Sequence, residues 1–277
     1  MPAHTLESIL KRDRGVVLFG LVLVSLFAWI YVIREASSMK GMSTMDMNMH
    51  MDMNMDLSMD VAMPQMHSWG AIDIVLIFTM WTVMMIAMMV PTAAPMILLF
   101  ATFNRKRREQ QRPFVRTGIF LIGYLIVWTG FSIIAALAQW GLHRAALLSP
   151  MMISTSPALG GSLLMVAGIF QWTPLKNTCL SHCRSPLDFF STDWREGSTG
   201  ALRMGLKHGG YCLGCCWVLM LLLFVTGVMN LVWIAGIAIF VLLEKVAPAK
   251  LRAYVSGGAG MVLIMAGLYM LLRNFLN

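Results

Sequence analysis

Methionine sulfur is the most abundant source of possible metal chemistry in this chain. The segment 39–66 alternates methionine with polar residues, and its central part reads MDMNMHMDMNMDLSMD. A thioether is a soft, uncharged ligand that selects Cu(I) or Ag(I) over harder ions. It also needs no deprotonation and forms no disulfide. We therefore predict a soft-metal site with ligands drawn from Met45, Met47, Met49, His50, Met51, Met53 and Met55.

The methionine run predicts the kind of metal more specifically than it predicts a biological role. Capture, buffering and delivery of an ion are all compatible with it. The alternative is a disordered polar tether whose methionines are incidental, although no other apolar residue precedes Leu57 for them to pack with. Cu(I) is the predicted ion, and Ag(I) and Zn(II) are the other ions that we consider.

Cysteine and histidine give a second group of candidate ligands. The motif HGGYCLGCC has the spacing that brings four ligand side chains to one broad helical face, namely those of His208, Cys212, Cys215 and Cys216. The motif CLSHC places two cysteines one turn apart if it is helical, and it contributes Cys179, His182 and Cys183. These seven residues are predicted metal ligands. A thiol–disulfide pair at Cys212-x-x-Cys215 and simple packing of small apolar thiols remain open.

A third group of sulfurs lies within an apolar stretch. In TMWTVMMIAMMVP, the residues Met80, Met84 and Met88 recur every four positions and share one helical face. Met85 and Met89 form an adjacent stripe. Methionine is also an ordinary gap-filler between packed helices, so ligation and packing both remain open for this stripe.

Lipid must solvate most of the chain that carries these residues. Hydrophobic residues make up 58% and charged residues 12%, with a mean hydropathy of +0.72, whereas a soluble domain is about a quarter charged. Runs of membrane-spanning length predict an all-α, polytopic transmembrane helix bundle. We expect seven spans, at about 15–33, 71–103, 117–140, 157–172, 210–229, 231–243 and 255–272. Pro91 and Pro95 predict a kink or a short interfacial helix after Val90.

Loop charge sets the expected orientation. Lysine and arginine cluster before the first span and in the loops after the second, fourth and sixth spans, while the alternate loops carry few. The positive-inside rule then places the N-terminus inside and the C-terminus outside, in a bacterial inner membrane. We divide the chain into an N-terminal anchor (1–34), a periplasmic methionine-rich linker (35–68) and a six-helix membrane domain (69–277). A cleaved signal peptide is the alternative for the first segment.

Glu244 is the remaining candidate, as an acidic residue at the inner end of the sixth span. Ionisable residues at such positions are often functional. Pairing with the neighbouring Lys245 and simple placement at the interface are the alternatives.

The net charge of +8 does not indicate nucleic-acid binding, because the basic clusters lie between apolar runs and lack interleaved aromatic residues.

Four stretches resemble a bacterial family described only as predicted metal-binding integral membrane proteins. They are MWTVMMIAMMVP, QWTPLKNTCLSHCRSP, GYCLGCCWVLMLLLFVTGVMN and FVLLEK, and the resemblance spans about 69–270. The family pattern falls on Trp81, Met84, Met88, Met89, Pro91, Pro174, Cys179, Cys183, Arg184, Cys212, Cys215 and Cys216. The resemblance implies a metal but does not say which one. The methionine run lies before the region that the resemblance covers.

The sequence therefore predicts a protein that handles Cu(I) in the membrane. The outer run captures the ion, and the methionine and cysteine sites pass it on or hold it. A membrane thiol–disulfide oxidoreductase and an accessory or assembly subunit of a copper enzyme are the other hypotheses. Enzymatic activity stays open, and no catalytic residue is assigned. The expected partners are lipid, the metal ion, and a copper chaperone or copper-enzyme subunits, but no nucleic acid.

Overall fold

The computed structural model describes residues 3–52, 70–109, 115, 117–145 and 156–276, and within these ranges it is all-helical. The side chains of 3–13, 40–52, 71, 106–109 and 275–276 lie outside the description. The helices are α1 (Ala3–Asp52), α2 (Ala71–Glu109), α3 (Thr117–Arg144), α4 (Pro157–Phe170), α5 (Pro174–Arg184), α6 (Pro186–Thr192), α7 (Gly197–Leu221), α8 (Leu223–Thr226), α9 (Leu231–Val246) and α10 (Ala249–Leu276).

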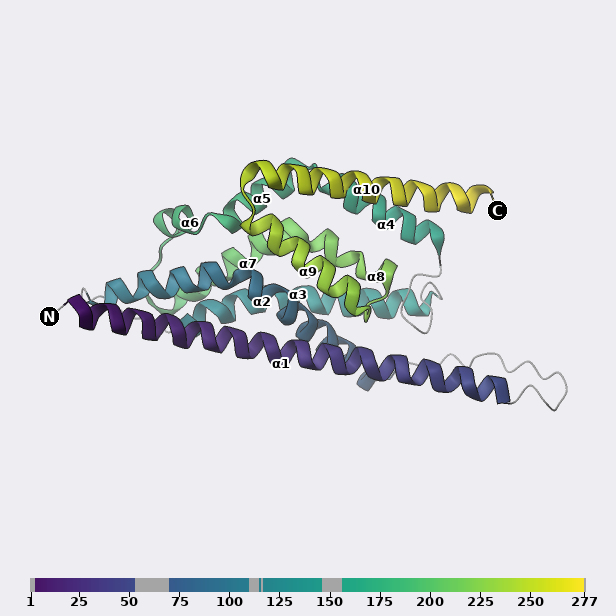
Figure 1. The fold of residues 1–277 in the computed structure, drawn as a ribbon, viewed down its shortest axis with the longest axis horizontal. Helices are drawn as coiled ribbons and strands as arrows, with labels where there is room; N and C mark the ends of the chain where they lie inside the picture. The colour runs from purple at the N-terminus through teal and green to yellow at the C-terminus, as the bar shows by residue number, and fades with distance from the viewer. Residues whose placement is uncertain (1–2, 53–69, 110–114, 116, 146–155, 277) are drawn as a thin grey trace.

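The long helices run side by side along one axis (Figure 1). α1 forms one edge and packs on α2, which packs on α3, and α3 packs on α7. The opposite edge is α4 packed on α10, and α9 lies between the two groups in contact with α2, α5 and α10. The N- and C-termini lie at opposite ends of the long axis.

Five stretches within the described residues are long and apolar enough to cross a membrane, which makes this a membrane protein. They are Arg14–Met39, Ile72–Arg105, Thr117–Arg144, Gly197–Thr226 and Ala249–Asn274, and the bent pair α4–α5 adds a sixth. α9 has 16 residues and is shorter than these. The expectation of seven spans is therefore supported for five or six, and the orientation of the bundle stays a prediction.

Two boundaries differ from expectation. α1 continues to Asp52, so half of the stretch expected to be a linker extends the first helix. α2 is one helix with Pro91 and Pro95 inside it, so no separate interfacial helix forms after Val90. Residues 53–69, including Met53 and Met55, lie outside the described residues.

The break between α4 and α5 follows directly from the sequence QWTP. The two helices are bent by 63° at this point. The Thr173 hydroxyl accepts a hydrogen bond from the Lys176 amide, and Pro174 occupies the first turn, where its missing N–H costs nothing. The bend turns CLSHC into a short helix that packs on α7.

α3 and α7 approach almost to backbone contact. A Cβ added at Gly205 would lie 2.1 Å from the Phe120 carbonyl oxygen, and one at Gly123 would lie 2.4 Å from the Leu202 oxygen. Only glycine permits so close a crossing. It also brings Tyr124 of α3 against the face of α7 that carries the cysteines.

Candidate metal centre

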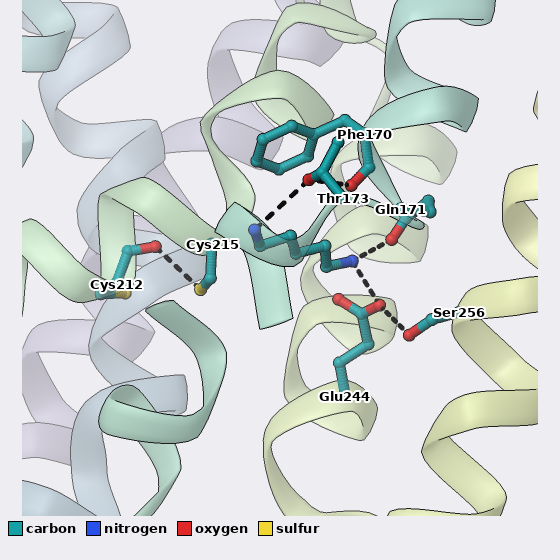
Figure 2. Close-up of polar contacts among 8 residues, drawn as sticks. Phe170, Gln171, Thr173, Cys212, Cys215, Glu244 and Ser256 are labelled. Atoms are coloured by element: carbon teal, nitrogen blue, oxygen red, sulfur yellow. Dashed lines mark hydrogen bonds and ion pairs between the residues drawn. The ribbon is translucent and has the colours of Figure 1, made fainter. Parts of the chain in front are cut away.

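Four of the five thiols meet where α5 packs on α7. Cys183 of α5 lies beside Cys212 and Cys215 of α7. The thiols of Cys215 and Cys216 donate to the Cys212 carbonyl oxygen at 3.0 and 2.9 Å, the first of which is drawn in Figure 2. All four residues are buried. The helical spacing therefore does gather the α7 cysteines, and α5 adds one more sulfur to them.

His208 lies one turn before Cys212 on α7 and is 1% exposed. Its ring stacks at 5.6 Å from the ring of Tyr124 and at 6.0 Å from that of Phe120. Within the described part of the chain, neither ring nitrogen has a hydrogen-bond partner. A buried polar atom without a partner calls for an explanation, and a free imidazole nitrogen beside thiols is a donor that copper accepts.

Two polar groups from other helices contact the Cys212 sulfur. The Lys245 ammonium of α9 lies 3.1 Å from it and donates to the Thr92 hydroxyl of α2 at 2.8 Å. The Tyr124 hydroxyl also lies 3.1 Å from this sulfur and donates to the Met89 carbonyl oxygen at 3.1 Å. α3 and α9 thus meet at one sulfur atom of α7, and α2 holds both of the groups that contact it.

These donors are close together but are not arranged around a cavity for an ion. No group of three or more histidine, cysteine or acidic side chains in the described ranges is placed to hold a metal. The thiols of Cys215 and Cys216 hydrogen-bond to the backbone carbonyl of Cys212, while Lys245 covers one side of the Cys212 sulfur. Since cysteine binds metal as the thiolate, loading requires loss of these protons and rotation of the side chains. The donor set nonetheless suits Cu(I), which prefers soft ligands.

The other two candidate ligands of CLSHC, Cys179 and His182, lie at the periphery. Cys179 is half-buried, and its sulfur lies 2.8 Å from where a Cβ on Gly214 would stand. His182 is exposed, stacks on Tyr211 with ring centroids 4.7 Å apart, and has Nδ1 within 2.9 Å of the Thr178 carbonyl oxygen. The structure therefore does not bring His182 to the buried thiols.

The predicted methionine stripe is buried inside the bundle. Met84 and Met88 are at most 1% exposed and Met80 is 5% exposed. The Met89 carbonyl oxygen accepts from Tyr124 and the Thr92 hydroxyl accepts from Lys245, so α2 just beyond Met88 bonds the two groups that contact Cys212. Met45, Met47, Met49, His50 and Met51 belong to the last turns of α1, but their side chains are not described.

Glu244 belongs to a separate network, partly drawn in Figure 2. Its carboxylate accepts hydrogen bonds from Lys176 of α5 and Ser256 of α10, both at 2.5 Å, and Lys176 also donates to Gln171. Lys176 and Glu244 are 1% and 2% exposed. The alternative pairing of Glu244 with Lys245 is wrong, because successive residues on a helix point about 100° apart.

Sequence reasoning missed Lys245 and Tyr124 as neighbours of the Cys212 thiol, and Thr92 as the partner of Lys245. A signal was present for Lys245, since a lysine that ends an apolar helix is expensive to bury. Nothing in the sequence indicates Tyr124 or Thr92, because their positions depend on how α2 and α3 pack on α7.

Thiol reactivity gives a direct check on this arrangement. In the folded protein in detergent, Cys179 is expected to react with a water-soluble maleimide at least about tenfold faster than the four buried cysteines, because exposure controls access to a thiol. Mass spectrometry of peptides after timed labelling measures each rate. Cys179→Ser should abolish the fast phase, and fast labelling of Cys212 would contradict the burial described above.

The fold and its thiol cluster define an all-α membrane protein with a buried, sulfur-rich centre. A model of the family described as PpoB2 copper chaperones matches residues 78–270. Because the match covers more than half of the chain, this protein belongs to that family, and its function involves copper. No curated protein and no solved structure matches the chain. The matched region holds the cysteines and the methionine stripe and excludes the methionine run.

Proposed function

We propose that this protein binds Cu(I) as cargo, collects it at the methionine run and carries it to the thiols of α5 and α7. The observation that carries the proposal is the burial of four thiols beside His208, whose ring nitrogens have no partner in the described chain. Membership in a copper chaperone family supports the metal. An ion that passes from thioether to thiolate by ligand exchange never has to be released into lipid.

The proposed orientation places the methionine run in the periplasm of a bacterial inner membrane. The long helices, with α4 and α5 taken together and α9 included, alternate in direction along the bundle, and α1 begins at the opposite end from where α10 ends (Figure 1). This arrangement supports an odd number of crossings. With the basic loops inside, copper enters at the methionine run, and a copper-enzyme subunit or a soluble chaperone is the proposed recipient.

Metal content of purified variants tests the proposal. One variant carries serine at Cys183, Cys212, Cys215 and Cys216, and a second carries leucine at the six methionines of 45–55 and alanine at His50. In anaerobic titrations against a Cu(I) chelator, the serine variant is expected to lose its tightest copper, with affinity falling more than about tenfold. The second variant should lose only its outer copper.

The matched control replaces Met261 and Met265 by leucine. Both are exposed on α10, with exposed fractions of 61% and 62%, and lie outside the proposed site. This control should bind copper as the wild type does. If the serine variant retained the wild-type affinity, the thiols would not be the site, and the proposal would fail.

Thiol–disulfide exchange is the second candidate, favoured by the contact of Cys183 with Cys212 and Cys215. Cys183 and one of these two α7 thiols would pass two electrons and two protons to a substrate disulfide and would themselves become a disulfide. Trapping of a mixed disulfide by a single cysteine variant at 215, with copper binding unchanged, would favour this function over the first.

A further inference from the structure

Lys245 places a positive charge inside the sulfur cluster, and the proposed function does not use it. Its ammonium contacts the Cys212 sulfur at 3.1 Å, and the thiols of Cys215 and Cys216 bond the carbonyl oxygen of the same Cys212. It is 8% exposed. No carboxylate among the described residues forms an ion pair with it. Its hydrogen-bond partners are the neutral hydroxyl of Thr92 and the Cys212 sulfur.

The other buried charges close to this site cancel each other. Glu244, the residue before Lys245, is paired with Lys176 at 2.5 Å and turns towards α5 and α10. That pair contributes no net charge. The charge of the sulfur cluster is therefore set by Lys245, by the thiols that lose their protons, and by the metal ion that binds them.

Charge balance then separates monovalent from divalent ions. Two thiolates around Cu(I) or Ag(I) carry a net charge of −1, and the Lys245 ammonium brings the whole to zero. The same two thiolates around Zn(II) or Cd(II) are neutral, and Lys245 leaves an excess charge of +1. A net charge in a buried, low-dielectric site is costly, so for an ion held by two thiolates the lysine favours the monovalent ion.

We infer that Lys245 is a specificity-determining residue that makes the thiol site of α5 and α7 select soft monovalent cations over divalent ones. This inference rests on the proposed function, since it assumes that the thiols bind the metal. It goes further in naming the group that distinguishes Cu(I) and Ag(I) from Zn(II) and Cd(II), a distinction that thiolate ligands alone do not make. Lys245 acts on the ion through its charge and does not ligate it.

The test compares Ag(I) and Cd(II), which are both soft and redox-stable, on the full chain in detergent. Equilibrium dialysis followed by mass spectrometry of the metals gives the ratio of the two affinities. Lys245→Gln removes the charge and keeps a polar group for Thr92. We expect this ratio to shift towards Cd(II) by more than about tenfold, since a unit charge a few ångströms away acts strongly on a bound ion even when partly screened.

Two further variants complete the test. Lys245→Arg keeps the charge and should keep the wild-type preference for Ag(I), and Lys207→Gln, which removes an exposed lysine of α7, should do the same. If Lys245→Gln does not fold, the double variant Lys245→Leu with Thr92→Val removes both polar partners together, which a buried site tolerates better, and the same shift is expected of it.

The outcomes separate this inference from the proposed function. An unchanged ratio in the neutral variants, with wild-type Ag(I) binding intact, would overturn the role of Lys245 and leave the thiol site standing. A shift towards Cd(II) in Lys245→Arg would overturn it too. If the wild type bound neither Ag(I) nor Cu(I) at the cysteines, the proposed function itself would fail.

Discussion

Glu244→Gln is expected to destabilise the protein by about 3–5 kcal/mol. The substitution leaves the Lys176 ammonium buried at 1% exposure with only neutral partners, and loss of one member of a buried ion pair has a cost of that order. The Glu244 carboxylate also joins α9 to α5 and, through Ser256, to α10. Unfolding of the purified variant in mixed detergent and denaturant measures the loss.

An exposed ion pair provides the matched control. Lys207 and Asp193 are 2.6 Å apart, and their side chains are 44% and 26% exposed. Asp193→Asn should cost less than about 1 kcal/mol, because water and salt screen such pairs. Joint replacement of Lys176 by methionine and Glu244 by leucine should restore most of the lost stability, because no unpaired charge remains. Equal losses in all three variants would show that the pair does not hold the helices together.

Helix-borne features of the site followed from the sequence. The spacing of His208, Cys212, Cys215 and Cys216 correctly placed all four on one buried face, because α7 is a single helix through them. The apolar runs likewise indicated five of the helices that are long and apolar enough to cross a membrane, although α7 begins at Gly197, 13 residues before the expected start at 210. Both kinds of inference need only the period of a helix and the dimensions of a bilayer.

Contacts between helices could not be predicted from the sequence. Cys183 reaches the α7 thiols because the chain bends by 63° at QWTP and α5 then packs on α7. The sequence predicts that a helix ends at QWTP, but it does not predict the angle of the bend. Lys245 and Glu244 are neighbours in sequence yet serve two separate networks. His182 and Cys183 are also neighbours, and only Cys183 faces the cluster. The repeat of a helix determines which residues share a face, but it does not determine which other helix packs on that face.

The crossing of α3 and α7 leads to the second large effect. Gly205→Ala is expected to destabilise the protein by more than about 3 kcal/mol, above the usual cost of overpacking. The added Cβ would lie 2.1 Å from the Phe120 carbonyl oxygen, and backbone cannot rotate away as a side chain can. α3 and α7 would have to move apart to make room. That movement would draw the Tyr124 hydroxyl away from the Cys212 sulfur, which lies 3.1 Å from it, so copper affinity should fall together with stability.

Gly210→Ala is the control, on the same helix. A Cβ at Gly210 meets nothing within 4 Å, and alanine is favoured over glycine inside a helix by up to about 1 kcal/mol. This variant should be as stable as the wild type or more so, with unchanged copper binding. Opposite signs for the two glycines would show that α3 positions the thiols through backbone contact. A tolerated Gly205→Ala would mean that the helices can separate without loss, and that the cysteine face of α7 does not depend on α3 for its place.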